Sequence, residues 1–406
     1  MDRVILHCDC NGYFASVECI ERPELKLVPM AVCGNPESRH GIILAKNELA
    51  KKYGIQTAET VWQAKRKCPN LTLVPPHHDR YQYYCGLINS IYGEYTDQVE
   101  AFSIDESWLD VTGSQRLFGD GRQIADELRR RVREELGLTI SVGVSFNKVF
   151  AKLGSDYQKP DATTVITREN YREILFPLPV RDMLFVGANA AAELNRKGVM
   201  TIGDLADTPP ERLHAMLGRL GDMLWAYANG LDDAPVRRAG ESDPVKSISN
   251  SITFPRDLIG EEDIKTGLLM LADSVGARMR RQQAAGHTVQ VQIKSPELKV
   301  ISRQETLRTP TDSTREIYQT ALGVVRRSWD MRRPVRMLSL GCTNFASPGA
   351  PVQTSLFDNE TDERHDRQLR LETAVDGIRR RFGPDSIGFG QTMHTDLGSR
   401  PRKEDP

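Results

Sequence analysis

The segment Val99-Glu-Ala-Phe-Ser-Ile-Asp-Glu-Ser-Trp-Leu-Asp-Val111 is the part of the sequence that most strongly constrains the fold. Apolar residues flank a polar centre, a pattern that predicts two short strands joined by a tight turn. We therefore expect Asp105 and Glu106 at the apex of that turn. Two adjacent carboxylates repel each other, and burial beside apolar residues would raise their pKa values. A divalent cation would relieve this conflict by taking the carboxylate oxygens as ligands.

A third carboxylate comes from the beginning of the sequence. The run Val4-Ile-Leu-His-Cys-Asp9 predicts a β-strand, and Asn11-Gly12 predicts a sharp turn directly after it. With Asp105 and Glu106, Asp9 fits a site for two Mg²⁺ ions that would hold the attacking and leaving oxygens of a phosphoryl transfer. Taken singly, each residue is more simply explained as a solvated surface charge or a strand cap.

Composition narrows the class of protein. The 406 residues are enough for two to four domains. With 54 Lys and Arg against 55 Asp and Glu, a nucleic-acid-binding protein would have to concentrate its positive charge locally. The seven cysteines form no Cys-x-x-Cys pair, which indicates reduced thiols. We see neither a signal peptide nor a membrane-length apolar run, and expect a cytoplasmic protein that does not bind membranes.

The order of elements around the acidic segment predicts an α+β domain. A small mixed section extending to about residue 77 separates the first strand from a helix over 79–95. The acidic hairpin follows, and then come a helix over 121–136 and a buried strand over 138–145. This order resembles the split β-α-β-β-α-β arrangement.

Three lysines after the last of these strands could reach the acidic residues or their substrate: Lys148, Lys152 and Lys159. An ammonium group supplies a compact positive charge for phosphate oxygens. We favour Lys159, because Pro160 fixes the turn that carries it. The alternative for each lysine is a solvent-exposed side chain.

The second half of the chain predicts further domains. Residues 167–233 predict helices joined by glycine turns, whose backbone N–H groups can hold nucleic-acid phosphates. Residues 234–244 predict a linker, and 245–345 an α/β domain with 16 Lys and Arg against 10 Asp and Glu. Its arginine clusters could bind a phosphate backbone. For both domains, a purely structural role is an equally good interpretation.

The remaining residues, 346–406, are mostly charged. Gln353-Thr-Ser-Leu-Phe357 places two large apolar side chains in this polar segment, which cannot bury Leu356 and Phe357 by itself. A partner's groove is the natural place for them. A short helix is expected over 367–382.

Together these motifs resemble those of the Y-family translesion DNA polymerases, the DNA polymerase IV type, over roughly residues 1–345 and part of the tail. The motifs are His7–Glu18, Ser103–Asp110, and Ser141–Lys152 followed by Lys159-Pro160. The resemblance implies a DNA-directed DNA polymerase for low-fidelity translesion synthesis, acting as a monomer on primer–template DNA and deoxynucleoside triphosphates at the nucleoid. It also implies an α+β multidomain, right-hand architecture: palm (1–10 and 78–166), small fingers (11–77), helical thumb (167–233), linker (234–244), α/β little finger (245–345) and C-terminal tail (346–406).

The resemblance also implies roles for individual residues. Asp9, Asp105 and Glu106 would be catalytic metal ligands, assisted by the Cys10 carbonyl, for two Mg²⁺ ions or Mn²⁺ in their place. The remaining implied roles are Tyr13 beneath the incoming sugar and base, Phe14 as the sugar gate that excludes a ribose 2′-hydroxyl, Lys159 and Lys51 on the triphosphate, and Gln353, Leu356 and Phe357 on the sliding clamp.

This sequence departs from the family pattern in three places. Asn11 replaces a second Asp that is not a metal ligand in that pattern. In Asn47-Glu-Leu-Ala-Lys51, Glu48 stands where the family has a phosphate-contacting Tyr, and Lys51 where it has Arg. We expect Glu48 to turn away from phosphate or to pair with a lysine. The turn over 186–189 lacks one of the usual glycines, which weakens the case for phosphate contact there.

Two other classes of protein remain as alternatives. A catalytically silent DNA-binding scaffold would keep the basic domain and the clamp peptide but would have no use for the acidic triad. A nucleotidyl cyclase would keep a similar sheet but would not need the thumb turns or the clamp peptide. The acidic triad and the C-terminal half therefore discriminate among the three.

Overall fold

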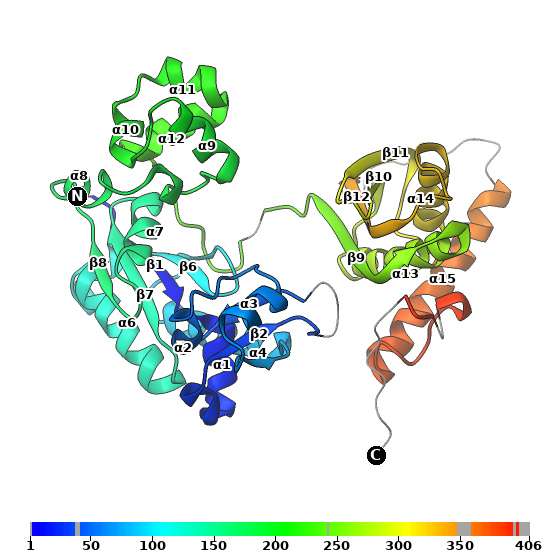
Figure 1. Cartoon of the computed structure of the whole chain (residues 1–406), viewed down its shortest axis with the longest axis horizontal. Helices are drawn as coiled ribbons and strands as arrows, with labels where there is room; N and C mark the ends of the chain where they lie inside the picture. The colour runs from blue at the N-terminus through cyan, green and yellow to red at the C-terminus, as the bar shows by residue number, and fades with distance from the viewer. Residues whose placement is uncertain (1, 37–40, 242, 347–358, 393–394, 398–406) are drawn as a thin grey trace. The chain divides into compact units, whose positions relative to one another are not determined.

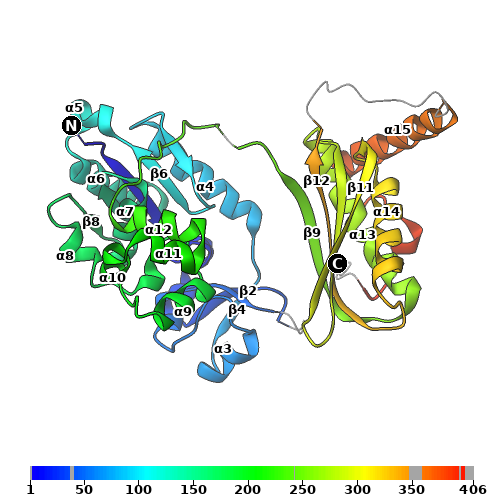
Figure 2. The ribbon, with the colours of Figure 1, turned by 90° about the horizontal axis from the view of Figure 1, so that it is seen from above.

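The computed structural model describes residues 2–36, 41–241, 243–346, 359–392 and 395–397. It divides into two compact units, Met1–Ser242 and Asp243–Pro406 (Figures 1 and 2). Among the helices in these ranges, none is both long enough and apolar enough to cross a membrane.

A five-stranded sheet forms the centre of the first unit. Its strands lie in the order β5 (Val99–Ala101), β6 (Glu106–Asp110), β1 (Ile5–Cys10), β7 (Ile140–Ser145) and β8 (Thr163–Val165). β1 is antiparallel to both of its neighbours, and β8 adds a parallel strand beside β7. With α4 (His78–Gly93) and α6 (Gly121–Leu136) as connections, this is the predicted split β-α-β-β-α-β order.

The two faces of this sheet differ because side chains alternate along a strand. Leu6, Cys8 and Cys10 belong to an apolar core that also contains residues of α4 and α6. The intervening residues of β1 point to the other face, which α7 (Lys148–Tyr157) covers. Asp9 therefore lies under α7 and not in the apolar core.

α7 lies unusually close to β7 because glycines face each other across the contact. A Cβ atom at Gly143 would come within 1.9 Å of the Ala151 carbonyl oxygen and 2.5 Å of the Ser155 nitrogen. Gly154 faces it from the helix, where a Cβ would lie 3.1 Å from the Gly143 Cα. Any side chain at Gly143 would force α7 away from the sheet and move Lys152 with it.

Two further sections complete the first unit. The section between β1 and α4 contains a three-stranded sheet in the order β3 (Ile43–Lys46), β2 (Met30–Cys33) and β4 (Thr72–Val74), with α1 (Tyr13–Glu21), η1 (Pro23–Leu27), α2 (Glu48–Lys51) and α3 (Val61–Lys67). Two short elements, η2 (Thr112–Ser114) and α5 (Gln115–Phe118), precede α6. The second section is helical and follows β8. It contains α8 (Tyr171–Leu175), η3 (Val180–Asp182), α9 (Ala188–Arg196), α10 (Ile202–Asp207), α11 (Pro210–Leu217) and α12 (Arg219–Ala228).

The second unit is a four-stranded antiparallel sheet with helices on one face (Figure 2). The strands lie in the order β11 (Val300–Thr311), β10 (Gly286–Lys294), β12 (Val335–Phe345) and β9 (Ser247–Leu258). α13 (Gly260–Arg281) and α14 (Thr314–Ser328) share one apolar core with alternate residues of β9, β10 and β12.

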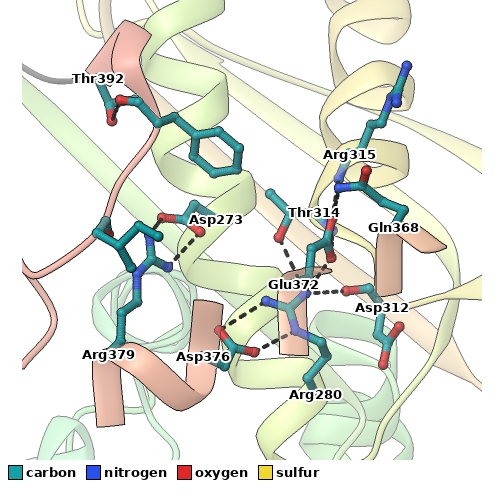
Figure 3. A network of polar contacts seen from close by, with 12 residues as sticks. Asp273, Arg280, Asp312, Thr314, Arg315, Gln368, Glu372, Asp376, Arg379 and Thr392 are labelled. Atoms are coloured by element: carbon teal, nitrogen blue, oxygen red, sulfur yellow. Dashed lines mark hydrogen bonds and ion pairs between the residues drawn. The ribbon is translucent and has the colours of Figure 1, made fainter. Parts of the chain in front are cut away.

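The C-terminal helix α15 (Asn359–Phe382) is fastened to this unit by charged side chains, and η4 (Gly390–Thr392) follows it. Figure 3 shows Arg280 of α13 between two carboxylates of α15, with Glu372 at 2.8 Å and Asp376 at 2.6 Å. Glu372 also accepts hydrogen bonds from the backbone N–H groups of Thr314 (2.9 Å) and Arg315 (3.3 Å). The N-cap residue of α14 has no side-chain cap bond of its own, so Glu372 serves as the cap.

This cap should contribute measurably to stability. Glu372→Ala would leave Arg280 with one carboxylate fewer and uncap α14, so we expect a loss of about 3 kcal/mol in the free energy of unfolding. Glu305→Ala, which removes an exposed pair with Arg327, is the control and should cost less than about 1 kcal/mol. Urea denaturation measures both, and equal costs would contradict the assigned role of Glu372.

Candidate active site

Strand register brings the three predicted carboxylates together. Asp9 pairs with Glu106 across the β1–β6 ladder, and opposite residues of such a pair share one face. The Cys10 N–H donates to the Asp105 carbonyl oxygen at 3.0 Å, which holds the hairpin turn against the end of β1. Asp9 is buried, while Asp105 and Glu106 are half-buried.

Two of the three candidate lysines reach this cluster. The Lys152 Nζ lies 3.2 Å from Asp9 Oδ2 and 3.2 Å from Glu106 Oε2. The Lys159 Nζ lies 2.8 Å from Asp9 Oδ2. Lys148 binds Glu100 instead, at 2.7 Å.

The sequence prediction missed Asp156, which holds both of these lysines. Its carboxylate lies 3.0 Å from the Lys152 Nζ and 2.6 Å from the Lys159 Nζ. The available signal was spacing, because Asp156 follows Lys152 by four residues and precedes Lys159 by three.

Positive charge is distributed unequally over the cluster. Burial raises the pKa of Asp105, and the negative charges of Asp9 and Glu106 add to this effect. Burial also opposes ionisation of Glu106, but His7 and Lys152 outweigh it and lower its pKa to about 2. Burial disfavours the Lys159 ammonium too, yet Asp9 and Asp156 raise its pKa. Two carboxylates are thus matched with lysines, while Asp105 lies in the more negative surroundings.

Within the described ranges, no three His, Cys, Asp or Glu side chains are arranged around one metal position. The Lys152 ammonium lies near both Asp9 and Glu106, where a cation would otherwise balance their charge. Glu106 Oε2 lies 3.2 Å from the Lys152 Nζ and 3.4 Å from the His7 Nε2, but neither contact has the geometry of a hydrogen bond. A buried carboxylate oxygen without a hydrogen bond fits a hard cation, so the donor set suits Mg²⁺.

Aromatic residues lie at the start of α1, just beyond the acidic cluster. Gly12 takes a left-handed conformation at φ 54°, which turns the chain from β1 into the helix. The Tyr13 hydroxyl donates to the Tyr81 carbonyl oxygen at 2.6 Å. The Phe14 ring stacks on the Tyr81 ring, with centroids 4.0 Å apart and planes 11° from parallel.

Further cations lie beside this turn. A Cβ at Gly12 would be 3.3 Å from the Lys46 carbonyl oxygen, so β3 ends against the turn. Burial and the positive charge of Lys51 lower the pKa of Lys46, a residue that the sequence prediction missed. Lys51 is exposed and lies 3.6 Å from Glu48, which pairs with a lysine as expected. Gln353, Leu356 and Phe357 lie outside the described residues.

Comparison with known proteins identifies the relatives of this chain. Residues 8–156 match the model of the impB/mucB/samB family, and residues 245–356 match the model of that family's C-terminal domain. The DNA polymerase IV of Acetivibrio thermocellus is 48% identical over 390 residues, which cover 96% of this chain and 97% of that relative. The DNA polymerase IV of Moorella thermoacetica is 39% identical over 94% of both chains. A solved Y-family DNA polymerase chimera shares the fold, with a TM-score of 0.75 at 24% identity over 85% of this chain and all of that one.

The charges around Glu106 predict that the free energy of unfolding depends on pH. Because the pKa of Glu106 falls from 4.5 to about 2 on folding, its contribution to stability is full above about pH 4.5 and is lost as the pH falls toward 2. Glu106→Gln should therefore lower the unfolding free energy by up to ~3 kcal/mol at pH 7 and progressively less below pH 4.5. Urea denaturation between pH 7 and pH 2.5 tests this, with the exposed Glu134→Gln as control. A pH-independent difference would contradict the prediction.

Proposed function

This chain belongs to the Y-family DNA polymerases, of the DNA polymerase IV type, and on that premise we propose that Asp9, Asp105 and Glu106 form its catalytic centre. The chain is a DNA-directed DNA polymerase of the class that serves DNA damage tolerance. The observation that carries the proposal is the β1–β6 register, which brings Asp9 opposite Glu106, with the Asp105 carbonyl bonded to Cys10. Neither a silent scaffold nor a cyclase is favoured, because the DNA polymerase IV similarity extends over both halves of the chain.

These three carboxylates, assisted by the Cys10 carbonyl, would hold two Mg²⁺ ions, with Mn²⁺ as a substitute. Bound there, the metal would lower the pKa of the primer 3′-hydroxyl and neutralise charge on the triphosphate. The raised pKa of Asp105 supports a need for added positive charge beside it, whereas Glu106 already has the Lys152 ammonium at 3.2 Å. Once that charge is supplied, Asp9 would no longer need both ammoniums, and Lys159 would be free to hold triphosphate oxygens.

The incoming deoxynucleoside triphosphate would lie between the acidic cluster and the start of α1. Tyr13 would support its sugar and base, and the Phe14 ring would fill the space that a ribose 2′-hydroxyl needs. Lys51 would add charge at the triphosphate. Lys46 is a new candidate for the same role, because β3 ends against the Gly12 turn that follows Asp9.

We assign the palm to residues 1–10 and 78–166, the fingers to 11–77, the thumb to 167–233 and the little finger to 245–345, joined through 234–244. α15 packs on the little finger and extends it. Some arginines of the little finger already form ion pairs within the protein. Arg280 pairs with Asp376 of α15, and Arg326 pairs with Glu261. The sheet face opposite the helices offers polar uncharged side chains suited to a phosphate backbone: Ser251, Gln290, Gln292, Ser302, Gln304 and Ser339.

The proposed role is low-fidelity synthesis on damaged templates at the bacterial nucleoid, by a monomer tethered to the sliding clamp. Gln353, Leu356 and Phe357 would enter a groove of the clamp. Single-nucleotide insertion on intact and lesion-bearing templates tests the fidelity proposal. Fidelity equal to that of a replicative polymerase would contradict it.

Primer extension tests the catalytic centre. Asp105→Ala or Asp9→Ala should reduce the extension rate by at least ~10²-fold with Mg²⁺ while leaving DNA binding intact. Asp97→Ala is the matched control, because Asp97 is exposed and pairs only loosely with Arg238, at 3.6 Å. Unchanged extension by both site variants would refute the assignment, and an intact protein that binds DNA without extending a primer would favour the scaffold.

Clamp binding is tested separately from chemistry. Leu356→Ala with Phe357→Ala should weaken clamp affinity by more than ~10-fold and shorten products made on clamp-loaded DNA. Single-nucleotide insertion without the clamp should not change. Leu371→Ala, which truncates an exposed leucine of α15, is the control. Undiminished clamp affinity in the double variant would contradict the proposed contact.

A further inference from the structure

A buried carboxylate behind Phe14 has no role in the chemistry proposed above. Glu18 lies one turn after Phe14 on α1 and is only 1% exposed. Its Oε1 accepts a hydrogen bond from the Tyr81 hydroxyl at 2.5 Å and lies 2.8 Å from the His77 Nδ1. Its Oε2 is buried without a hydrogen-bond partner. Burying a carboxylate is costly, so a carboxylate at this position calls for a specific function.

Glu18 binds Tyr81, and the ring of Tyr81 packs against the ring of Phe14. Tyr81 is fully buried in α4, and its ring stacks face to face on the Phe14 ring. The ring is anchored at its far end by Glu18, and the backbone carbonyl of Tyr81 accepts the Tyr13 hydroxyl. His78 adds an edge contact to both rings, at 5.8 Å from Phe14 and 5.7 Å from Tyr81.

This arrangement restricts movement of Phe14 toward α4. The ring can recede in that direction only if Tyr81 moves, and Tyr81 can move only by breaking its bond to a buried carboxylate. An anchored ring rejects an added hydroxyl better than a mobile one, because a shift of about 1 Å can already change a rate by ~10²-fold. Stiffness behind the ring therefore bears on selectivity, and Glu18 is linked to the ring through Tyr81.

We propose that Glu18, acting through Tyr81, fixes the Phe14 ring and thereby determines how strictly the enzyme refuses ribonucleoside triphosphates. This inference rests on the proposed role of Phe14 as the sugar gate. Glu18 is a positioning residue, since it acts through Tyr81. His77, which is partly exposed, provides a second partner that keeps the Glu18 carboxylate oriented toward Tyr81.

A purely structural role would give different results. If Glu18 only ties α1 to α4, its loss should lower stability and affect deoxy- and ribonucleotides alike. If it positions the gate, its loss should change the ratio of kcat/KM for a deoxynucleotide to kcat/KM for the matching ribonucleotide. That ratio is therefore the decisive quantity.

The experiment measures the ratio for full-length protein in single-nucleotide insertion. Tyr81→Phe keeps the stacked ring and removes the donor of its anchor, and Glu18→Leu keeps the approximate size of the side chain and removes the acceptor. We expect the ratio to fall by ~10-fold to ~100-fold in both variants, mainly through faster ribonucleotide insertion. Tyr83→Phe removes an exposed hydroxyl from the same helix and should keep the wild-type ratio.

Loss of folding must be separated from loss of positioning. The double variant Tyr81→Phe/Glu18→Leu removes both polar partners together, so it should recover stability that a single change loses. Its ratio should nevertheless stay low, because the ring is still unanchored. Thermal unfolding of every variant accompanies the kinetic measurement.

Phe14→Ala distinguishes the two proposals. A wild-type ratio in Phe14→Ala would refute the sugar gate and this inference with it. A collapsed ratio in Phe14→Ala, together with wild-type ratios in Tyr81→Phe, Glu18→Leu and the double variant, would overturn only the role of Glu18. Low ratios in all of these variants, with an unchanged Tyr83→Phe control, would support it.

Discussion

The register of β1 between β6 and β7 is the constraint on which the rest of the site depends. Side chains alternate along a strand, so a shift by one residue would exchange the two faces of β1. Asp9 would then enter the apolar core formed with α4 and α6, and Leu6 would lie beneath the lysines of α7. That exchange would place a charge among apolar side chains and apolar side chains among the charged groups beneath α7, so the core selects the same register that the proposed active site requires.

The close contact between α7 and β7 extends this constraint to the positive charges. Gly143 lets the helix approach until Lys152 reaches both Asp9 and Glu106. Asp156 then offsets part of the charge of the two lysines, which keeps them from neutralising the carboxylates completely. The two lysines and Asp156 therefore form one charge network with Asp9 and Glu106.

The sequence alone predicted those parts of the fold and the site that depend on local pattern. Strand periodicity and the Asn11-Gly12 turn were enough to indicate where Asp9 would stand, and the split sheet order was confirmed. Local pattern could not choose between Lys148 and Lys152, because that choice depends on which carboxylate lies across the sheet. Nor could it reveal Lys46, whose position against Gly12 follows from packing between distant segments.

The same limit applies to α15, because its sequence predicted a helix but not the contacts by which the helix packs on the domain. A short helix was expected over 367–382, and the observed helix begins earlier, at Asn359; its Leu371 and Phe382 are exposed, at 59% and 66%. The helix docks by Glu372, which caps α14 and pairs with Arg280. A helix N-terminus and a buried guanidinium together make a favourable place for one carboxylate, whereas either alone would compensate its burial less well.

Glu18 and Glu372 thus represent a use of carboxylates different from that of Asp9, Asp105 and Glu106. Both are almost fully buried, and each joins helices far apart in the sequence through hydrogen bonds to fixed groups. The sequence did not indicate these contacts, because their partners Tyr81 and Thr314 are 63 and 58 residues away, although Glu18 closes the His7–Glu18 motif. A carboxylate surrounded by fixed donors gives rigidity, whereas one that retains an unbonded oxygen beside other carboxylates can bind a cation. Glu18 has one oxygen of each kind, but its neighbours are a tyrosine and a histidine and not further carboxylates, so its surroundings favour the first role.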